Sequence, residues 1–124
     1  EKYNLLPSLE EWKEKILFLE TSEEIITPEK LRLFLLELKK RDILDSVKGL
    51  LIGKPVDEIY YDEYKEVYKE FFKDSNLPIM YNINFGHASP RCFLQYDAEA
   101  TVDYDKKIIR VRSCNLLNDN KSIK

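Results

Sequence analysis

Three short apolar runs alternate with two longer stretches of helical periodicity, and this alternation constrains the fold more than any other feature. The runs lie at residues 15–19, 50–52 and 78–81. Short apolar runs without helical spacing are typical of buried strands, and we expect the first to be covered on both faces. Strands separated by helices favour parallel pairing, with the helices packed on the sheet. The first part of the chain is therefore predicted to run β-α-β-α-β.

Two helices are predicted between these strands. The first begins at Thr27-Pro28, because a hydroxyl cap followed by proline at the first helical position is a common helix start. Its expected buried positions share the spacing i, i+3, i+4, i+7 and are Leu31, Phe34, Leu35 and Leu38.

The second helix is predicted from about residue 57 to residue 73. Its apolar positions follow the helical repeat and are Tyr60, Tyr64, Val67, Tyr68, Phe71 and Phe72. The tyrosines suggest either an aromatic binding surface or core packing. We favour packing, because tyrosine commonly buries its ring and keeps its hydroxyl near water.

Further β-structure is predicted beyond Pro90. Residues 92–96 have the pattern of a strand with Cys92 packed inside, and residues 98–102 pair with residues 107–112 as an antiparallel hairpin. The predicted fold class is therefore α/β: a mixed sheet with two main helices and a C-terminal β-hairpin.

The predicted domain spans residues 15–112 and is long enough for a core of its own. Residues 1–14 lead into it from a missing N-terminal domain, with a short helical turn beginning near Pro7-Ser8, and residues 113–124 form a polar tail. The chain begins at Glu1 instead of methionine, which indicates a piece of a longer protein.

Charge and cysteine usage exclude several classes of function. A net charge of −3 argues against binding to a nucleic-acid backbone, which needs a basic face, and no apolar stretch is long enough for a membrane span. Cys92 and Cys114 come with no disulfide framework or signal peptide, so we expect reduced thiols and a cytoplasmic protein. One histidine and two cysteines without ligand spacing predict no metal, and three glycines form no phosphate-binding loop, so no cofactor is expected.

The single histidine, His87, lies on a glycine-containing loop that follows the third apolar run and ends at Pro90. Such a loop can hold a general base at a sheet edge, although a surface or capping histidine is the alternative. Glu20 directly follows the first strand, where it would either orient His87 at a shared sheet edge or remain a solvated turn residue. A convincing nucleophile is missing, because Ser89 lies only two residues beyond His87 and no Gly-x-Ser-x-Gly motif occurs.

Three segments together resemble a known family. They are ILFLETSEE at residues 16–24, GLLIGKP at residues 49–55 and PIMYNINFGHASP at residues 78–90. In this order they resemble the C-terminal domain of the serine-type LD-carboxypeptidase and microcin C immunity protein (MccF-like) family, serine peptidase family 66. The likeness extends over residues 15–111, and the Phe-Leu-Glu and Asn-x-x-Phe-Gly-His signatures are specific when they occur together.

The resemblance implies a swivelling β/β/α-like domain and a Ser-Glu-His catalytic triad whose glutamate and histidine match Glu20 and His87. His87 would take the proton of the serine and donate it to the leaving amine, while Glu20 orients the imidazole. The serine would belong to a separate flavodoxin-like N-terminal domain that this chain lacks. The isolated chain is therefore expected to be inactive.

The resemblance also implies a substrate class. Glu-Thr-Ser at residues 20–22 is closer to the microcin immunity branch, which cleaves an amide-like bond in a toxic aminoacyl-nucleotide analogue. Removal of a terminal D-alanine from muropeptides is the alternative, and a non-catalytic binding module is another. The expected partners are the N-terminal domain and a small peptide or aminoacyl-nucleotide, with no nucleic acid and no membrane. An apolar docking patch is also expected, which leaves self-association into a homodimer open.

Overall fold

The computed structural model describes residues 5–112 of the chain. The chain divides after Cys92 into two compact units, and each unit is described by itself. The predicted polar tail and Cys114 lie outside the described residues.

The first unit is built on a parallel sheet of three strands in the order β1-β2-β3. The strands are β1 (Ile16–Leu19), β2 (Gly49–Gly53) and β3 (Ile79–Ile83). Helix α2 (Pro28–Lys40) connects β1 to β2, and α4 (Tyr61–Phe71) connects β2 to β3. The predicted α/β class and the β-α-β-α-β order are confirmed.

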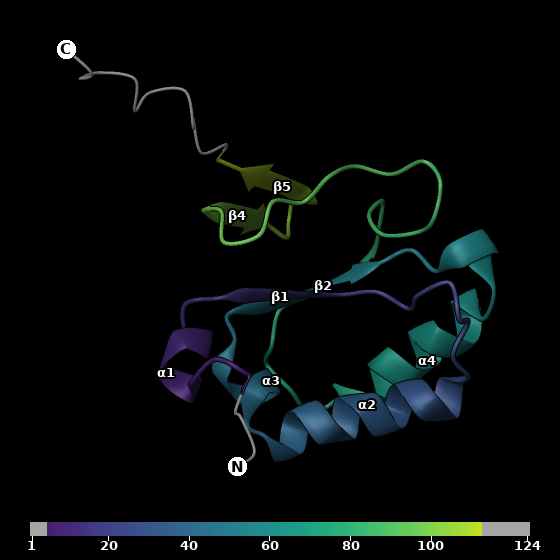
Figure 1. The fold of residues 1–124 in the computed structure, drawn as a ribbon, viewed down its shortest axis with the longest axis horizontal. Helices are drawn as coiled ribbons and strands as arrows, with labels where there is room; N and C mark the ends of the chain where they lie inside the picture. The colour runs from purple at the N-terminus through teal and green to yellow at the C-terminus, as the bar shows by residue number, and fades with distance from the viewer. Residues whose placement is uncertain (1–4, 113–124) are drawn as a thin grey trace. The chain divides into compact units, whose positions relative to one another are not determined.

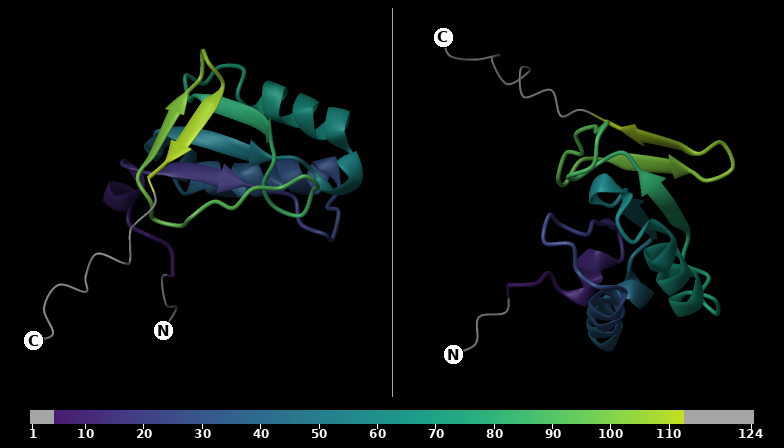
Figure 2. Two further views of the ribbon diagram at one scale, coloured as in Figure 1. Left: turned by 90° about the horizontal axis from the view of Figure 1, so that it is seen from above. Right: turned by 90° about the vertical axis from the view of Figure 1, so that its right-hand side faces the viewer.

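Both long helices lie side by side on one face of this sheet (Figures 1 and 2). Sequential strand order with right-handed crossovers requires this arrangement, because each helix returns over the same face. The core between helices and sheet is apolar and consists of Leu31, Leu35, Leu44, Leu50, Ile52, Tyr64, Val67, Tyr68 and Phe72. Strand β2 is buried along its whole length, as predicted. Strand β1 is only partly buried, because it lies at the edge of the sheet, so the expectation that both its faces are covered is wrong.

Helix α2 begins as the sequence predicts. The Thr27 side chain accepts a hydrogen bond from the Lys30 backbone N–H at 3.3 Å, and Pro28 is the first helical residue. Leu31 and Leu35 are buried, but Phe34 is 47% exposed, contrary to the prediction. Phe34 thus lies outside the buried stripe of α2, and Arg32 of the same helix forms an ion pair with Glu70 of α4.

Helix α4 begins later than predicted. Residues Val56–Glu58 form a 3-10 turn, and Asp57 and Tyr60 have φ angles of +49° and +58°, which the α-helix does not accommodate. From Tyr61 the predicted spacing holds, and Tyr64 and Tyr68 are buried. The burial of these rings supports core packing over an exposed tyrosine surface.

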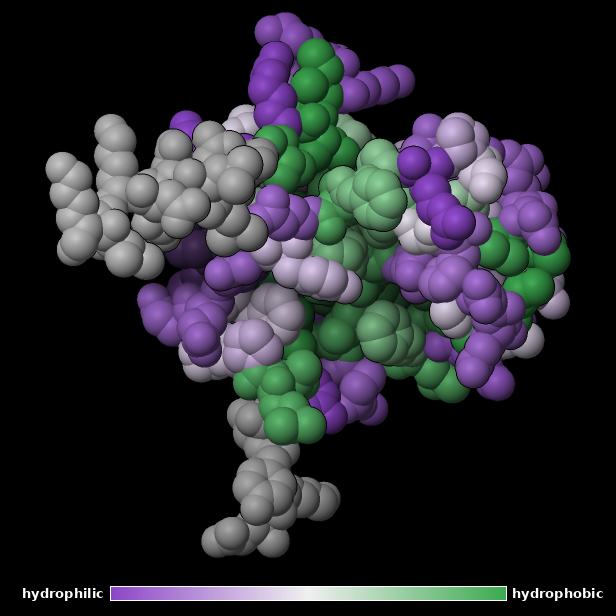
Figure 3. Space-filling model, turned by 45° about the horizontal axis from the view of Figure 1, so that its top comes forward, coloured by the Kyte–Doolittle hydropathy of each residue, from purple (hydrophilic) through white to green (hydrophobic). Residues whose placement is uncertain are grey.

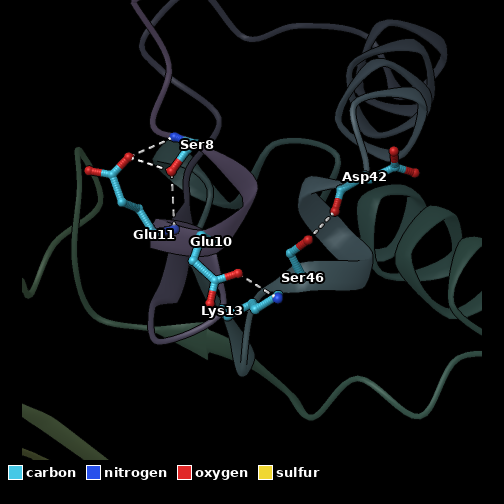
Figure 4. A network of polar contacts seen from close by, with 6 residues as sticks. All are labelled: Ser8, Glu10, Glu11, Lys13, Asp42 and Ser46. Atoms are coloured by element: carbon cyan, nitrogen blue, oxygen red, sulfur yellow. Dashed lines mark hydrogen bonds and ion pairs between the residues drawn. The ribbon is translucent and has the colours of Figure 1, made fainter.

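Two short helices complete the first unit. Helix α1 (Leu9–Trp12) is held by a reciprocal cap, because the Ser8 side chain accepts from the Glu11 N–H and the Glu11 carboxylate accepts from the Ser8 N–H (Figure 4). Helix α3 (Ile43–Ser46) contacts both α1 and α2. The helical turn expected after Pro7-Ser8 is confirmed.

The second unit is an antiparallel hairpin of β4 (Ala100–Asp103) and β5 (Ile108–Val111), which confirms the predicted pairing. The Lys106 N–H donates to the Asp103 side chain across the turn at 3.0 Å. The strand predicted at residues 92–96 is not formed, and Cys92 is exposed instead of packed. In the described chain no strand pairs with this segment, and an isolated extended segment has no ladder to stabilise it.

Apolar as well as charged side chains reach the surface, as Figure 3 shows for one face. On α2 the exposed apolar residues are Leu33, Phe34 and Leu36. Within residues 5–112 no helix is long and apolar enough to cross a membrane.

Candidate active site

The carboxyl ends of the three parallel strands meet at one edge of the sheet, and the two candidate residues leave from the two outer strands. Glu20 follows β1, and His87 lies four residues beyond the end of β3. Neighbouring strands lie about 4.8 Å apart, so β1 and β3 are separated by roughly 10 Å. The side chains therefore meet only if the chain after β3 folds back over the end of β2.

Gly53, the last residue of β2, leaves room for this approach. A Cβ atom at this position would lie 3.0 Å from the Phe85 ring and 3.3 Å from the Glu20 Cβ atom. The returning chain is held by a hydrogen bond from the Lys54 N–H to the Ile83 carbonyl at 2.8 Å. Phe85 packs edge-to-face on Phe18 of β1, with ring centroids 5.5 Å apart. A side chain at position 53 would occupy the space in which Phe85, after β3, approaches Glu20, after β1.

Gly86 makes the turn that points His87 back toward β1. Its φ angle is +88°, a conformation that residues with a Cβ atom rarely adopt. A Cβ atom here would also lie only 1.6 Å from Glu20 Oε2. Glycine is thus required at this position both for the backbone angle and for the space that the Glu20 carboxylate occupies.

Glu20 and His87 are in direct contact. His87 Nδ1 lies 3.2 Å from Glu20 Oε1 and 3.3 Å from Oε2, and the His87 backbone N–H donates to Oε2 at 3.1 Å. The two side chains are 31% and 36% exposed, so the pair lies at the surface of this unit. Because a carboxylate only accepts, the contact favours the tautomer with the proton on Nδ1. Nε2 then carries the lone pair that can accept a proton from a hydroxyl group.

The structure adds Glu23, which the sequence analysis did not single out. Its Oε1 atom lies 3.7 Å from His87 Nε2, too far for a hydrogen bond but close enough to attract a protonated imidazole. The side chain is 78% exposed. Its position three residues after Glu20 is the only sequence signal, and the direction of a loop side chain cannot be derived from such spacing.

Other candidate groups lie outside this contact. Within residues 5–112 the His87 ring contacts the two glutamates, and neither Ser89 nor Cys92 is among its partners. The same residues bring together no group of three histidine, cysteine or acidic side chains suited to a metal ion. The described residues therefore place an imidazole against a carboxylate, with no serine or cysteine side chain among the contacts of the ring.

Gly86→Ala is expected to separate Glu20 from His87. The added methyl group needs the space of the carboxylate, and the positive φ angle costs roughly 1–3 kcal/mol for a residue with a Cβ atom. We expect a matching loss in the free energy of unfolding and a roughly 10- to 100-fold loss of turnover in the full-length protein. Urea unfolding and steady-state kinetics measure both. A variant with normal stability and normal turnover would show that the space at Gly86 is not needed.

Comparison with known proteins gives three findings. A family model described as the LD-carboxypeptidase C-terminal domain matches residues 2–102. A curated protein of Treponema pallidum (strain Nichols), described as "Putative carboxypeptidase", is 30% identical over 115 residues, which are 89% of this chain and 34% of that protein. A crystal structure of an MccF-like protein from Streptococcus pneumoniae in complex with AMP is similar, with a TM-score of 0.80 and 45% identity over 87% of this chain and 31% of that one. The chain thus spans about a third of the length of each relative.

Proposed function

This chain belongs to the LD-carboxypeptidase family, as a C-terminal domain, and we propose that it supplies Glu20 and His87 to the Ser-Glu-His triad of a serine-type hydrolase. The observation that carries the proposal is the contact of the Glu20 carboxylate with both the Nδ1 atom and the backbone N–H of His87. A carboxylate held at two points orients an imidazole better than one held at a single point. The serine would come from the remaining two thirds of the full-length protein.

The proposed reaction proceeds in two steps. His87 Nε2 accepts the hydroxyl proton while the serine oxygen bonds to the scissile carbonyl carbon, and the same nitrogen then protonates the leaving amine as the C–N bond breaks. Water next attacks the acyl-serine ester, giving its proton to Nε2, and the serine leaves with that proton. In both steps the imidazole becomes positively charged, and the negative charge of Glu20 stabilises it.

For the substrate, we propose an aminoacyl-nucleotide analogue cleaved at its amide-like bond, as in microcin C immunity. Glu-Thr-Ser after β1 supports this, together with 45% identity to an MccF-like protein whose structure contains AMP. Removal of D-alanine from a muropeptide is the second candidate, supported by the family description and by the relative from Treponema pallidum.

A direct comparison of the two substrates tests the proposal. The full-length protein is expected to cleave an aminoacyl-adenylate analogue with a kcat/KM at least about tenfold above that for a muropeptide tetrapeptide. The 124-residue chain alone is expected to show no turnover with either, since within residues 5–112 the His87 ring contacts glutamates and no serine or cysteine. Preference for the muropeptide would favour the second candidate. Hydrolysis by the isolated chain would contradict the proposed triad. Absence of hydrolysis by the full-length protein as well as by the isolated chain would also contradict it.

The proposed partner is the N-terminal domain of the same protein, which must approach His87 at the exposed sheet edge. The apolar residues Leu33, Phe34 and Leu36 on α2 remain a candidate docking patch for that domain or for a second copy in a homodimer.

A further inference from the structure

Tyr64 on α4 connects the core to the loop that carries Glu20. Its side chain is 2% exposed and lies in the core cluster with Leu35 and Ile52. The hydroxyl group donates a hydrogen bond to the backbone carbonyl of Ile26, which lies in the loop between β1 and α2. A phenylalanine would fill the same volume, so the hydroxyl group serves the contact with the loop instead of the packing.

The same hydroxyl group has a second partner at the other end of this loop. Thr21, directly after Glu20, is 7% exposed, and its side chain hydrogen-bonds to Tyr64. Burial raises the pKa of the Tyr64 hydroxyl, which therefore remains a protonated donor at neutral pH. Tyr64 thus contacts the loop at Thr21 and at Ile26, the residues on either side of the segment that carries Glu23.

Glu20 needs such support, because it lies just beyond the sheet. The last residue of β1 paired to β2 is Leu19, and Glu20 has no ladder partner in the described pairing. The direction of its side chain is therefore set by what holds Thr21 and by the contact with His87. A loop fixed only at its strand end would let the carboxylate move away from the imidazole.

We propose that Tyr64 is a positioning residue for Glu20: its hydroxyl group fixes the loop at Thr21 and Ile26 so that the carboxylate stays on His87 Nδ1. The consequence for turnover rests on the function proposed above, whereas the consequence for the contact itself does not. A displacement of about 1 Å at a reacting group can reduce turnover by up to roughly 100-fold.

The test is Tyr64→Phe in the full-length protein, with Tyr68→Phe as the matched control. Tyr68 lies one turn later on α4 and is 5% exposed in the same core, and its ring contacts Tyr81. We expect Tyr64→Phe to lower kcat about 10- to 100-fold with KM changed less than about twofold, and Tyr68→Phe to leave both within about twofold. If Tyr64 only stabilised the core, Tyr64→Phe and Tyr68→Phe would have the same kinetics whenever they lose the same amount of stability.

A second readout does not depend on activity. Nitrogen-15 NMR of the histidine rings reports the Nδ1–H proton of His87, identified by its loss in His87→Ala. We expect this signal to broaden through exchange with water in Tyr64→Phe and to persist in Tyr68→Phe. Thr21→Val, which removes only the other hydroxyl group, is expected to lower kcat in the same way. The kcat of the double variant should lie no more than about twofold below that of the less active single variant, because both substitutions act on the same loop.

These outcomes separate the two proposals. Wild-type kcat and a wild-type Nδ1–H signal in both Tyr64→Phe and Thr21→Val would overturn the positioning role, whatever His87→Ala does. Normal turnover of His87→Ala, with the Nδ1–H signal still lost in Tyr64→Phe, would overturn the proposed triad and retain the positioning role.

Discussion

His87→Ala in the full-length protein is expected to lower kcat/KM by about 10⁴- to 10⁶-fold, the range seen when a triad base is removed. The variant loses both the base that activates the serine and the acid that protonates the leaving amine. The remaining rate would come from substrate binding and from stabilisation of the oxyanion by the other domain. The measurement is steady-state kinetics with the preferred substrate.

Stability and rescue provide the controls for His87→Ala. The side chain is 36% exposed on a loop, so the melting temperature should change little. Added imidazole should restore part of the activity, because the vacated site can admit a free base next to Glu20. Ser89→Ala is the matched control, because Ser89 lies on the same loop and is not a partner of the ring among the described residues; it should keep turnover within about twofold. A His87→Ala variant as fast as the wild type would remove His87 from the mechanism.

Glu20→Gln is expected to lower kcat by about 10²- to 10⁴-fold, less than His87→Ala. The amide retains the shape of the side chain, and its oxygen can still accept from Nδ1–H. It loses the negative charge that stabilises the imidazolium, and its NH₂ group favours the wrong tautomer when it faces Nδ1. The loss should appear in kcat with KM nearly unchanged, since Glu20 acts on the base and not on the bound substrate.

Glu24→Gln is the matched control for Glu20→Gln. Glu24 lies on the same loop and is exposed, so the substitution removes one negative charge without touching His87. Its turnover should stay within about twofold of wild type. Equal losses in the two variants would show that the net charge of the loop matters instead of the orienting contact.

Local features of the fold could be predicted because their interactions lie within a few consecutive residues. Thr27 caps α2 through a hydrogen bond to Lys30, three residues later, and the hairpin turn closes within residues 103–106. The exposure of Phe34 could not be predicted in this way, because the buried stripe of α2 depends on where α4 lies. The strand expected at residues 92–96 failed for the same reason, since a strand needs a partner that its own residues do not specify.

For the candidate site, the order of the elements along the chain was enough to name Glu20 and His87, because they follow the first and third predicted strands. Parallel strands end at the same edge, and that rule needs only the order of the elements. That these side chains touch follows from the tertiary structure, because the contact needs the space left at Gly53 and Gly86. Distances across a sheet arise from packing between segments far apart in the chain, which no local pattern encodes.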